Sequence, residues 1–365
     1  MNLRKVSFQD YKKIFYLFKR NNLKLVTFEQ WKNLWQKNPF LKGGKQWTKG
    51  WLIEEKNKIT GHFGSFPTTY FLNNKLYLCS VLHGWVVDNK YRSQSILLLK
   101  KFFLQNNVDL FISSTTNPRA GKIMEALGFK KLSIATLNSS SFIILNFENT
   151  LKFLLDKSIL PFKGIILNLI KFPINLILNK KINYWKNNFS EKNIVRHRNI
   201  DTKFDFIWKK IKSSYSNNLI LKRDKKWLKW KLDYFLKKNQ AWLFFSIKNN
   251  KINGYAICIE NKNANDGLKR AFMIDLISFN QNKEVTINLV GSCIKEAKKR
   301  NCDVIEFRGF SQSIRSNINF FKPFIKKIKD NPFYYKSNNI KLKKILNKSY
   351  KLTPTYLDGD SIVSF

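Results

Sequence analysis

The stretch with the clearest chemical character lies in the first third of the chain, where a strand-like run ends in a polar turn. The run Trp85–Val87 leads to the sequence YRSQS at 91–95, and the apolar residues up to Phe102 then repeat with helical spacing. The start of a helix offers unpaired backbone N–H groups and the positive end of the helix dipole. Because Arg92 adds a fixed positive charge, this turn predicts a site for a pyrophosphate.

A second polar stretch follows the wholly apolar run Val108–Ser113. Ser113–Thr116 ends that run, and Pro118 then fits the first turn of a helix that Gly128 stops. The hydroxyl groups of Ser113–Thr116 could bind an acceptor or the pantetheine arm of a coenzyme, or they could be ordinary loop residues.

Carboxylates also interrupt two strand-like runs in the second half of the chain. Asp275 lies in FMIDLISF, and Glu306 and Arg308 lie in DVIEFRGF. A buried carboxylate requires a partner. One interpretation is an ion pair of Glu306 or Asp275 with Arg308. The other is an acceptor pocket in which one carboxylate accepts a proton.

Other chemistries lack a motif. The four cysteines stand far apart in apolar runs without CxxC or Cys/His spacing, so neither a zinc site nor a disulfide framework is predicted. The sequence contains no P-loop, HExxH, GxSxG or GxGxxG motif. Near the end, Asp358-Gly359-Asp360 indicates a turn before a last short strand.

The elements that must position these residues alternate between strand and helix over 1–147. Thr27 and Gln30 form a capping-box pattern that predicts the start of a helix. The expected central order is Gly50–Glu55, Ile59–Leu72 and Leu76–Val87 as strands, Gln94–Gln105 as a helix, Val108–Ser113 as a strand, Pro118–Ala126 as a helix, and about Lys131–Thr136 and Ser141–Phe147 as closing strands. The strand–helix–strand succession predicts a βαβ crossover with parallel strands.

The second half repeats this order from about residue 191, which predicts a duplicated fold. Between the halves, Ile159–Leu178 is strongly apolar but carries two lysines and two prolines, so we reject a transmembrane helix. A connector helix or a helix lying at a membrane surface remains possible. The expected division is 1–147, a connector 148–190, and 191–365.

The formal net charge of the 365-residue chain is +43. It indicates either a polyanionic partner, such as nucleic acid or anionic lipid, or a general compositional bias towards lysine. The lysines are scattered and form no basic arm, which favours the second interpretation. The start of the sequence lacks the apolar run of a signal peptide, so a cytoplasmic protein is expected, with a peripheral position at the inner membrane face as the alternative.

These motifs and this element order resemble the GNAT superfamily of acyl-CoA N-acyltransferases. The positions that carry the resemblance are Val87, Tyr91 and Arg92 at the first turn, and Asn117, Ala120, Leu127, Gly128 and Phe129 around the next helix. The WLKWK run at 227–231 is similar to a stretch in the second domain of a branch with two such domains. The resemblance implies an α/β fold with two tandem domains, each a central mixed sheet flanked by helices.

The resemblance also implies roles for single residues. An acyl-CoA would lie against Val86, Val87, Arg92, Ser93, Gln94, Ser95, Ile96 and Asn117. A backbone N–H near Val86 or Val87 would hold the thioester oxygen. His83 would accept the proton of the nucleophile, and strand alternation would place its side chain on one face with Val81 and Trp85. Asp275 and Glu306 would be the further catalytic candidates.

Two departures weaken the match. Ser95 and Leu97 stand where the family has phosphate-loop glycines, so side chains crowd the approach of a phosphate to the backbone. Met124 stands where many members carry a tyrosine that protonates the leaving thiolate. The second half lacks both glycines and arginine at the corresponding turn, so it resembles a degenerate domain.

The resulting expectation is an enzyme that transfers an acetyl or longer acyl group from acyl-CoA to an amine or hydroxyl of a small molecule, sugar or peptide by direct attack. One alternative is a Fem-like aminoacyl transferase that uses aminoacyl-tRNA. Another is a non-catalytic module that senses CoA or docks on a polyanion or a membrane.

Overall fold

The computed structural model describes residues 1–132, 134–157, 180, 185, 188–261, 267–328, 332–348 and 351–364. The chain forms two compact units. The first comprises 1–134, 200–231 and 329–365, and the second comprises 135–199 and 232–328. The apolar segment 159–178, for which a connector or interfacial helix is expected, lies outside the described residues.

The first unit is built on a mixed sheet in the order β1-β2-β3-β4-β5-β15-β6, with β9 paired to the far end of β3. Its strands are β1 (Asn2–Lys5), β2 (Gly50–Glu55), β3 (Lys58–Leu72), β4 (Lys75–Val87), β5 (Leu110–Ser113), β6 (Lys130–Lys131), β9 (Ile220–Leu221) and β15 (Tyr334–Ser337). β4 and β5 are parallel, as the expected βαβ crossover requires.

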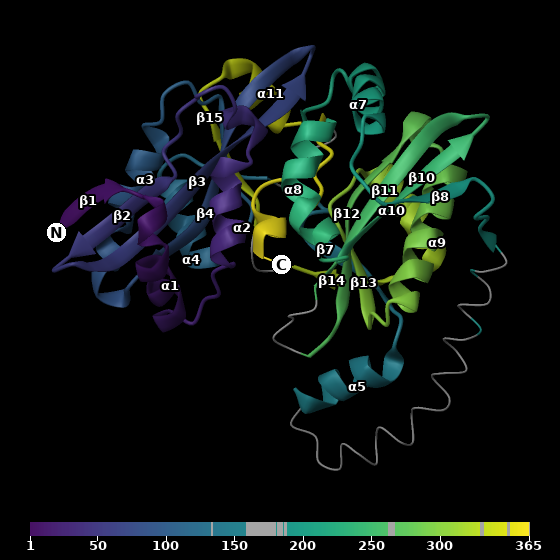
Figure 1. Ribbon diagram of the computed structural model, residues 1–365, viewed down its shortest axis with the longest axis horizontal. Coiled ribbons are helices and arrows are strands. Elements are labelled where there is room, and N and C mark those ends of the chain that lie inside the picture. The colour runs from purple at the N-terminus through teal and green to yellow at the C-terminus, as the bar shows by residue number, and fades with distance from the viewer. Residues whose placement is uncertain are drawn as a thin grey trace. The chain divides into compact units, whose positions relative to one another are not determined.

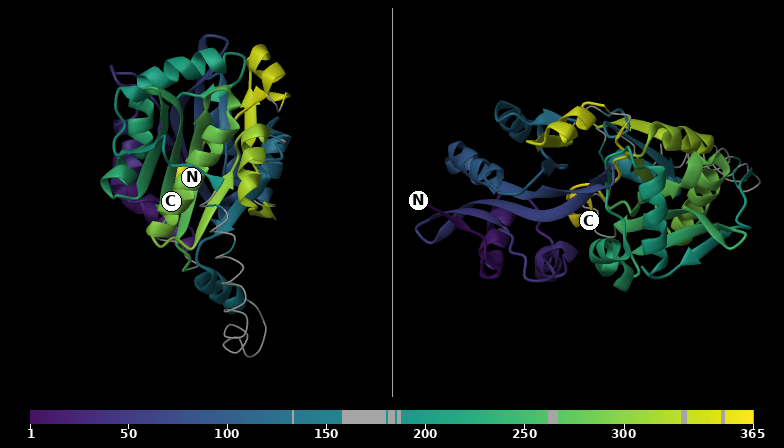
Figure 2. Two further views of the ribbon diagram at one scale, coloured as in Figure 1. Left: turned by 90° about the vertical axis from the view of Figure 1, so that its right-hand side faces the viewer. Right: turned by 90° about the horizontal axis from the view of Figure 1, so that it is seen from above.

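Helices cover both faces of this sheet (Figures 1 and 2). Those of the first unit are α1 (Tyr11–Arg20), α2 (Phe28–Gln36), α3 (Ser95–Phe103), α4 (Pro118–Ala126), α7 (Lys203–Ser214), the first half of α8 (Lys225–Lys237) and α11 (Ile340–Leu346). In the right-hand view of Figure 2, the purple α1 and α2 lie on one side of the long strands and the blue α3 and α4 on the other. Met124 of α4 packs with Phe63, Leu98 and Phe111 in a buried core between α3, α4 and the sheet.

The second unit has a sheet of the same kind, in the order β8-β10-β11-β12-β13-β7-β14. Its strands are β7 (Ser139–Ile144), β8 (Ile194–His197), β10 (Ala241–Lys248), β11 (Lys251–Asn261), β12 (Arg270–Ser278), β13 (Val304–Arg308) and β14 (Phe324–Lys327). Its helices are α5 (Phe147–Asp156), α9 (Lys283–Lys299), α10 (Gln312–Ile318) and the second half of α8. The core packs α9 against Trp242, Met273 and Phe307.

The two sheets confirm the predicted duplication, because their strands follow one another in equivalent order. One strand is exchanged between the halves of the chain. β7, expected to close the first sheet, pairs instead with β13 and β14 in the second sheet. β15, from the end of the chain, takes the equivalent place between β5 and β6 in the first sheet. The compact units therefore cross the expected boundary at residue 147.

Candidate active site

Strands β4 and β5 separate near the middle of the first sheet. Their parallel pairing covers only Cys79–Val81 opposite Leu110–Ile112, whereas β4 continues to Val87. On the other side β4 stays paired with β3, where the N–H of Asp88 donates to the carbonyl of Thr60 and Gly61 lies opposite Val87. In an antiparallel pair of strands, the N–H groups of successive residues point to opposite sides of the strand. The N–H of Asp88 points to β3, so the N–H of Val87, one residue earlier, points to the side from which β5 has separated.

A bulge interrupts β4 just before this point. His83 pairs with Gly64 and Val86 with His62, so two residues of β4, Gly84 and Trp85, stand opposite one residue of β3. Gly84 has φ +62°, and a side chain there would meet Phe18 and His62. The left-handed conformation and the close contact together favour glycine at this position.

The bulge changes which side chains share a face. Trp85 packs with Leu82 and Phe63 on the side of α3, with the Phe63 and Trp85 rings 5.4 Å apart. His83 follows Leu82 directly and therefore lies on the opposite face. The prediction that His83 and Trp85 share a face is wrong, because the extra residue shifts the alternation.

His83 faces a carboxylate from the last residues described in the chain. Its Nδ1 lies 3.6 Å from Oδ2 of Asp360, and both side chains are almost fully buried. Oδ1 of Asp360 accepts hydrogen bonds from the hydroxyls of Ser114, at 2.7 Å, and Thr115, at 3.0 Å. The polar end of β5 therefore orients the carboxylate towards His83. Both ring nitrogens of His83 lack a hydrogen-bond partner among the described residues.

The segment that carries Asp360 is anchored by a second carboxylate. Oδ1 of Asp358 accepts a hydrogen bond from the Tyr70 hydroxyl at 2.7 Å, and Oδ2 accepts one from the Thr355 N–H at 2.7 Å. Burial, followed by the charge of Asp358, raises the pKa of Tyr70 well above its ordinary value. Gly359 has φ +76°, and a side chain there would overlap that of Ser114. The segment thus fits closely against the sheet.

A buried lysine completes the cluster. Nζ of Lys231, on α8, lies 4.5 Å from the centre of the Phe66 ring and 4.6 Å from that of Trp230, and it donates to the carbonyl of Gly359 at 3.4 Å. Burial lowers the pKa of Lys231 to about 7, although the charges of Asp360 and Asp358 oppose this shift. Close to neutral pH, this amine therefore exchanges a proton more readily than an ordinary lysine does.

A second histidine, His62, stays neutral beside His83. Burial lowers its pKa to about 4, and its Nδ1 donates to the carbonyl of Gly84 at 2.6 Å. That hydrogen bond joins the His62 side chain to the backbone of the bulge at Gly84. We therefore assign His62 a structural role in holding the backbone that follows His83.

The expected pyrophosphate turn is more helical than the sequence indicates. Residues Asn89–Gln94 form a 3-10 helix that continues directly into α3. The N–H of Tyr91 donates to the carbonyl of Asp88, and that of Ser95 to the carbonyl of Arg92. Arg92, Ser93 and Ile96 are exposed, Ser95 and Val86 are buried, and Gln94 and Val87 are half-buried. The guanidinium group of Arg92 is thus at the surface, whereas the backbone N–H groups of Tyr91 and Ser95 already form hydrogen bonds within the helix.

The remaining candidates of the first unit lie around α4. Asn117 caps this helix, accepting a hydrogen bond from the Ala120 N–H at 2.9 Å. Met124 is fully buried, and the Thr116 hydroxyl lies 3.5 Å from its sulfur. Tyr334 of β15 packs on the same helix and donates to Oε1 of Glu125 at 2.8 Å. Burial, followed by this bond, raises the pKa of Tyr334 to about 12.

The two carboxylates expected in the second half lie in the second unit, each with a partner. Asp275 is fully buried on β12 and accepts a hydrogen bond from the Tyr255 hydroxyl at 2.5 Å. Glu306 on β13 forms an ion pair with Arg270 at 3.0 Å and accepts a hydrogen bond from Ser140. These contacts suit a structural role within the sheet.

Sequence reasoning missed most of the cluster around His83. Asp358 and Asp360 stood out only as turn residues, and Lys231 only as part of the WLKWK run. Ser114 and Thr115 were among the predicted binding residues, but their hydrogen-bond partner Asp360 was not predicted. The one usable signal was the density of acidic residues in a short apolar tail, because a buried carboxylate requires a partner.

Comparison with known proteins places the fold. No family model and no curated protein sequence matches the chain. Among solved structures, N-myristoyltransferase of Saccharomyces cerevisiae with bound myristoyl-CoA is similar at a TM-score of 0.54 and 13% identity, over 92% of this chain and 82% of that chain. A probable N-acyltransferase from Enterococcus faecalis is similar at a TM-score of 0.56 and 12% identity, over 92% of this chain and 72% of that chain. A GCN5-related N-acetyltransferase from Anabaena variabilis is similar at a TM-score of 0.54 and 9% identity, over 93% of this chain and 73% of that chain.

The chain shares the fold of these three structures. This likeness confirms the predicted mixed α/β fold of the GNAT type along nearly the whole chain. Within the described ranges, no helix combines the length and apolarity needed to cross a membrane. The same part of the chain holds no group of three or more histidine, cysteine or acidic side chains that could bind a metal ion.

Proposed function

We propose that the first unit transfers an acyl group from an acyl-CoA to an amine or hydroxyl of an acceptor. The observation that carries this proposal is the buried His83–Asp360 pair beside the stretch of β4 that β5 leaves unpaired. The fold supports it, because a structural neighbour over most of the chain holds myristoyl-CoA.

The thioester would lie along the unpaired side of β4. The N–H of Val87 points to that side and would donate to the carbonyl oxygen, whose negative charge grows as the nucleophile attacks. Arg92 and the start of the helical segment at Asn89–Gln94 would contact the phosphates. The paired N–H groups of Tyr91 and Ser95 make this contact depend more on the side chain of Arg92.

His83 would act as the proton acceptor. Oδ2 of Asp360 lies 3.6 Å from Nδ1, so a neutral ring that carries its proton on Nδ1 would leave Nε2 as the basic nitrogen. The acceptor amine attacks the carbonyl carbon, a C–N bond forms, and its proton passes to Nε2. The C–S bond then breaks, and the thiolate leaves and takes a proton from water. The carboxylate of Asp360 stabilises the imidazolium that forms.

The test is release of the CoA thiol from acetyl-CoA and from myristoyl-CoA in the presence of a panel of amines and amino sugars. His83→Gln and Asp360→Asn should each lower the rate about 100-fold or more, as loss of general-base catalysis does. His197→Gln, which changes a histidine of the second unit, is the matched control and should keep the wild-type rate. A full rate in His83→Gln would contradict the proposed role of this residue.

A further inference from the structure

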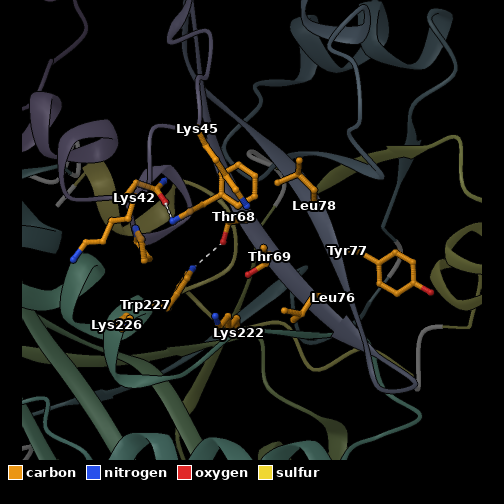
Figure 3. A pocket seen from close by; sticks show the side chains of 13 residues that line it. Lys42, Lys45, Thr68, Thr69, Leu76, Tyr77, Leu78, Lys222, Lys226 and Trp227 are labelled. Carbon is orange, nitrogen blue, oxygen red and sulfur yellow. Dashed lines mark hydrogen bonds between the residues drawn. The ribbon is translucent and has the colours of Figure 1, made fainter.

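A cavity of about 420 Å³ opens in the first unit on the side of β3 that faces α8. Lys42 and Lys45 reach it from the chain after the short helix Pro39–Leu41, Lys222 reaches it from the segment between β9 and α8, and Lys226 from the first turn of α8 (Figure 3). Its volume suits a small organic ligand. No residue considered so far as part of the acyl-transfer site lines it.

The lining carries positive charge. Four lysines and no carboxylate are among the described residues that line the cavity. Lys222 forms an ion pair with Asp224, just outside the lining, at 2.8 Å. Lys42, Lys45 and Lys226 are exposed at the rim. Lysines around one cavity favour a compact anion with more than one negative charge, such as a phosphate group.

Aromatic side chains also line the cavity. Trp227 is buried and fixed, because its Nε1 donates to the Thr68 hydroxyl at 2.9 Å. Phe40 adds a second ring, with Nζ of Lys45 4.9 Å from its centre. A rigid apolar surface beside the lysines suits a ligand that joins a phosphate to an apolar or ring-shaped part.

The cavity and the His83 cluster lie on the same face of β3. Phe66, Thr68 and Tyr70 alternate on that face: Phe66 contacts Lys231, Thr68 holds Trp227, and Tyr70 holds Asp358. Lys231 follows Trp227 by one turn of α8, with its Nζ 5.6 Å from the centre of the Trp227 ring. A ligand in the cavity would therefore be separated from the cluster by single side chains.

The distance between the two sites follows from the strand. Gly64 lies opposite His83, and Thr68 is four residues further along β3. At the rise of an extended strand this amounts to roughly 13 Å. A molecule with a phosphate in the cavity and a nucleophile at His83 must therefore be elongated.

We propose that this cavity binds the phosphate group of the acceptor. The acceptor class is an elongated phosphate ester whose amine or hydroxyl reaches His83 while its apolar part lies against Trp227 and Phe40. This assignment rests on the proposed acyl transfer, since only that reaction calls for an acceptor. Binding of a phosphate group in the cavity can be measured whether or not the protein transfers an acyl group.

The experiment is calorimetric titration of the full chain with phenyl phosphate at moderate salt, and with phenol as the probe that lacks the phosphate. The wild type should bind phenyl phosphate saturably and phenol much more weakly. The double variant Lys42→Glu/Lys226→Glu should weaken phenyl phosphate binding about tenfold or more, because two attractive charges become repulsive. The control Lys12→Glu/Lys19→Glu makes the same change in net charge on exposed positions of α1 and should leave the affinity unchanged.

Equal losses in the two double variants would mean that only the overall charge attracts the probe, and they would overturn the proposal. Unchanged binding in Lys42→Glu/Lys226→Glu would overturn it as well. Competition between acetyl-CoA and phenyl phosphate would assign the cavity to the phosphates of the donor and contradict the acceptor role. Lysine-dependent phenyl phosphate binding in a protein that binds no acyl-CoA would support the phosphate site and contradict the transfer reaction.

Discussion

His83 illustrates how a reactive side chain obtains its surroundings from distant parts of the chain. Its strand supplies the position, and the bulge at Gly84 turns the following residues to the other face. Its carboxylate partner Asp360 is held by hydroxyls 246 and 245 residues earlier in the chain. The residue type and the strand could be predicted from the sequence. The partner could not, because no local pattern joins positions so far apart.

Lys231 leads to a prediction on pH. Its pKa falls from an ordinary 10.5 to about 7 on folding, so between these values the unfolded chain binds more protons at this site than the folded chain does. The contribution of Lys231 to the free energy of unfolding therefore rises with pH across this window, by on the order of 1 kcal/mol per pH unit. The lowered pKa is thus a penalty on folding, which is absent above pH 10.5, grows as the pH falls and is complete below about pH 7.

Urea unfolding of the wild type and Lys231→Met at several pH values from 7 to 9.5 measures this effect. The difference in free energy of unfolding, wild type minus variant, should increase with pH. Lys229→Met, which changes an exposed lysine on the same helix, should show a constant difference. A constant difference for Lys231→Met as well would mean that its amine keeps an ordinary pKa.

The elements were predicted best where a local signal fixes them. The capping box at Thr27 and Gln30 forms as expected, and α4 begins at Pro118 and ends at Ala126 as predicted. The residues 89–94 were expected to form a turn before a helix that begins at Gln94, and they form a 3-10 helix that continues into α3. The missing glycines explain this outcome, because residues with side chains favour right-handed helical turns over the conformations that glycine allows.

The C-terminal segment gives a prediction at the scale of an element. Gly359→Ala places a side chain at φ +76° and against Ser114, whereas Gly44→Ala meets the same left-handed conformation, φ +81°, with nothing within 4 Å. Both variants carry the backbone cost of about 1 kcal/mol. Gly359→Ala should lose about 1–3 kcal/mol more from overpacking, and it should also displace Asp360 from His83.

Chemical unfolding of the two glycine variants provides the measurement, and the rate of thiol release provides a second one. Equal stability and equal activity in Gly359→Ala and Gly44→Ala would show that the segment does not pack closely on Ser114. Loss of activity in Gly359→Ala with Gly44→Ala unaffected would tie the segment to the reaction.

At the scale of the molecule, the duplication could be predicted from the order of elements, but the exchange of strands could not. β7 overlaps the run Ser141–Phe147 that was expected to close the first sheet. The two sheets have equivalent places, one between β5 and β6 and one between β13 and β14. β15 occupies the first and β7 occupies the second. The alternation of apolar residues in a sequence indicates which face of a strand is buried, but it does not indicate which strand lies next to it in the sheet.

The exchange predicts that residues 1–147 do not fold alone. This fragment lacks β15, without which β5 and β6 have no strand between them, and it lacks Asp358 and Asp360. Its leftover strand β7 would be exposed to aggregation. Circular dichroism should show no cooperative unfolding in urea for the fragment, in contrast to the full chain. A sharp transition would instead support a self-contained domain ending at residue 147.

Binding of the acyl donor tests the central claim most directly, by calorimetric titration of the full chain with acetyl-CoA and with myristoyl-CoA at moderate salt. We predict one saturable site per chain, lost in Arg92→Glu and retained in Asp360→Asn and in Lys100→Glu, an exposed charge reversal on α3. Binding of neither acyl-CoA to the folded protein, or equal binding in Arg92→Glu and Lys100→Glu, would contradict an acyl-CoA site at the end of β4.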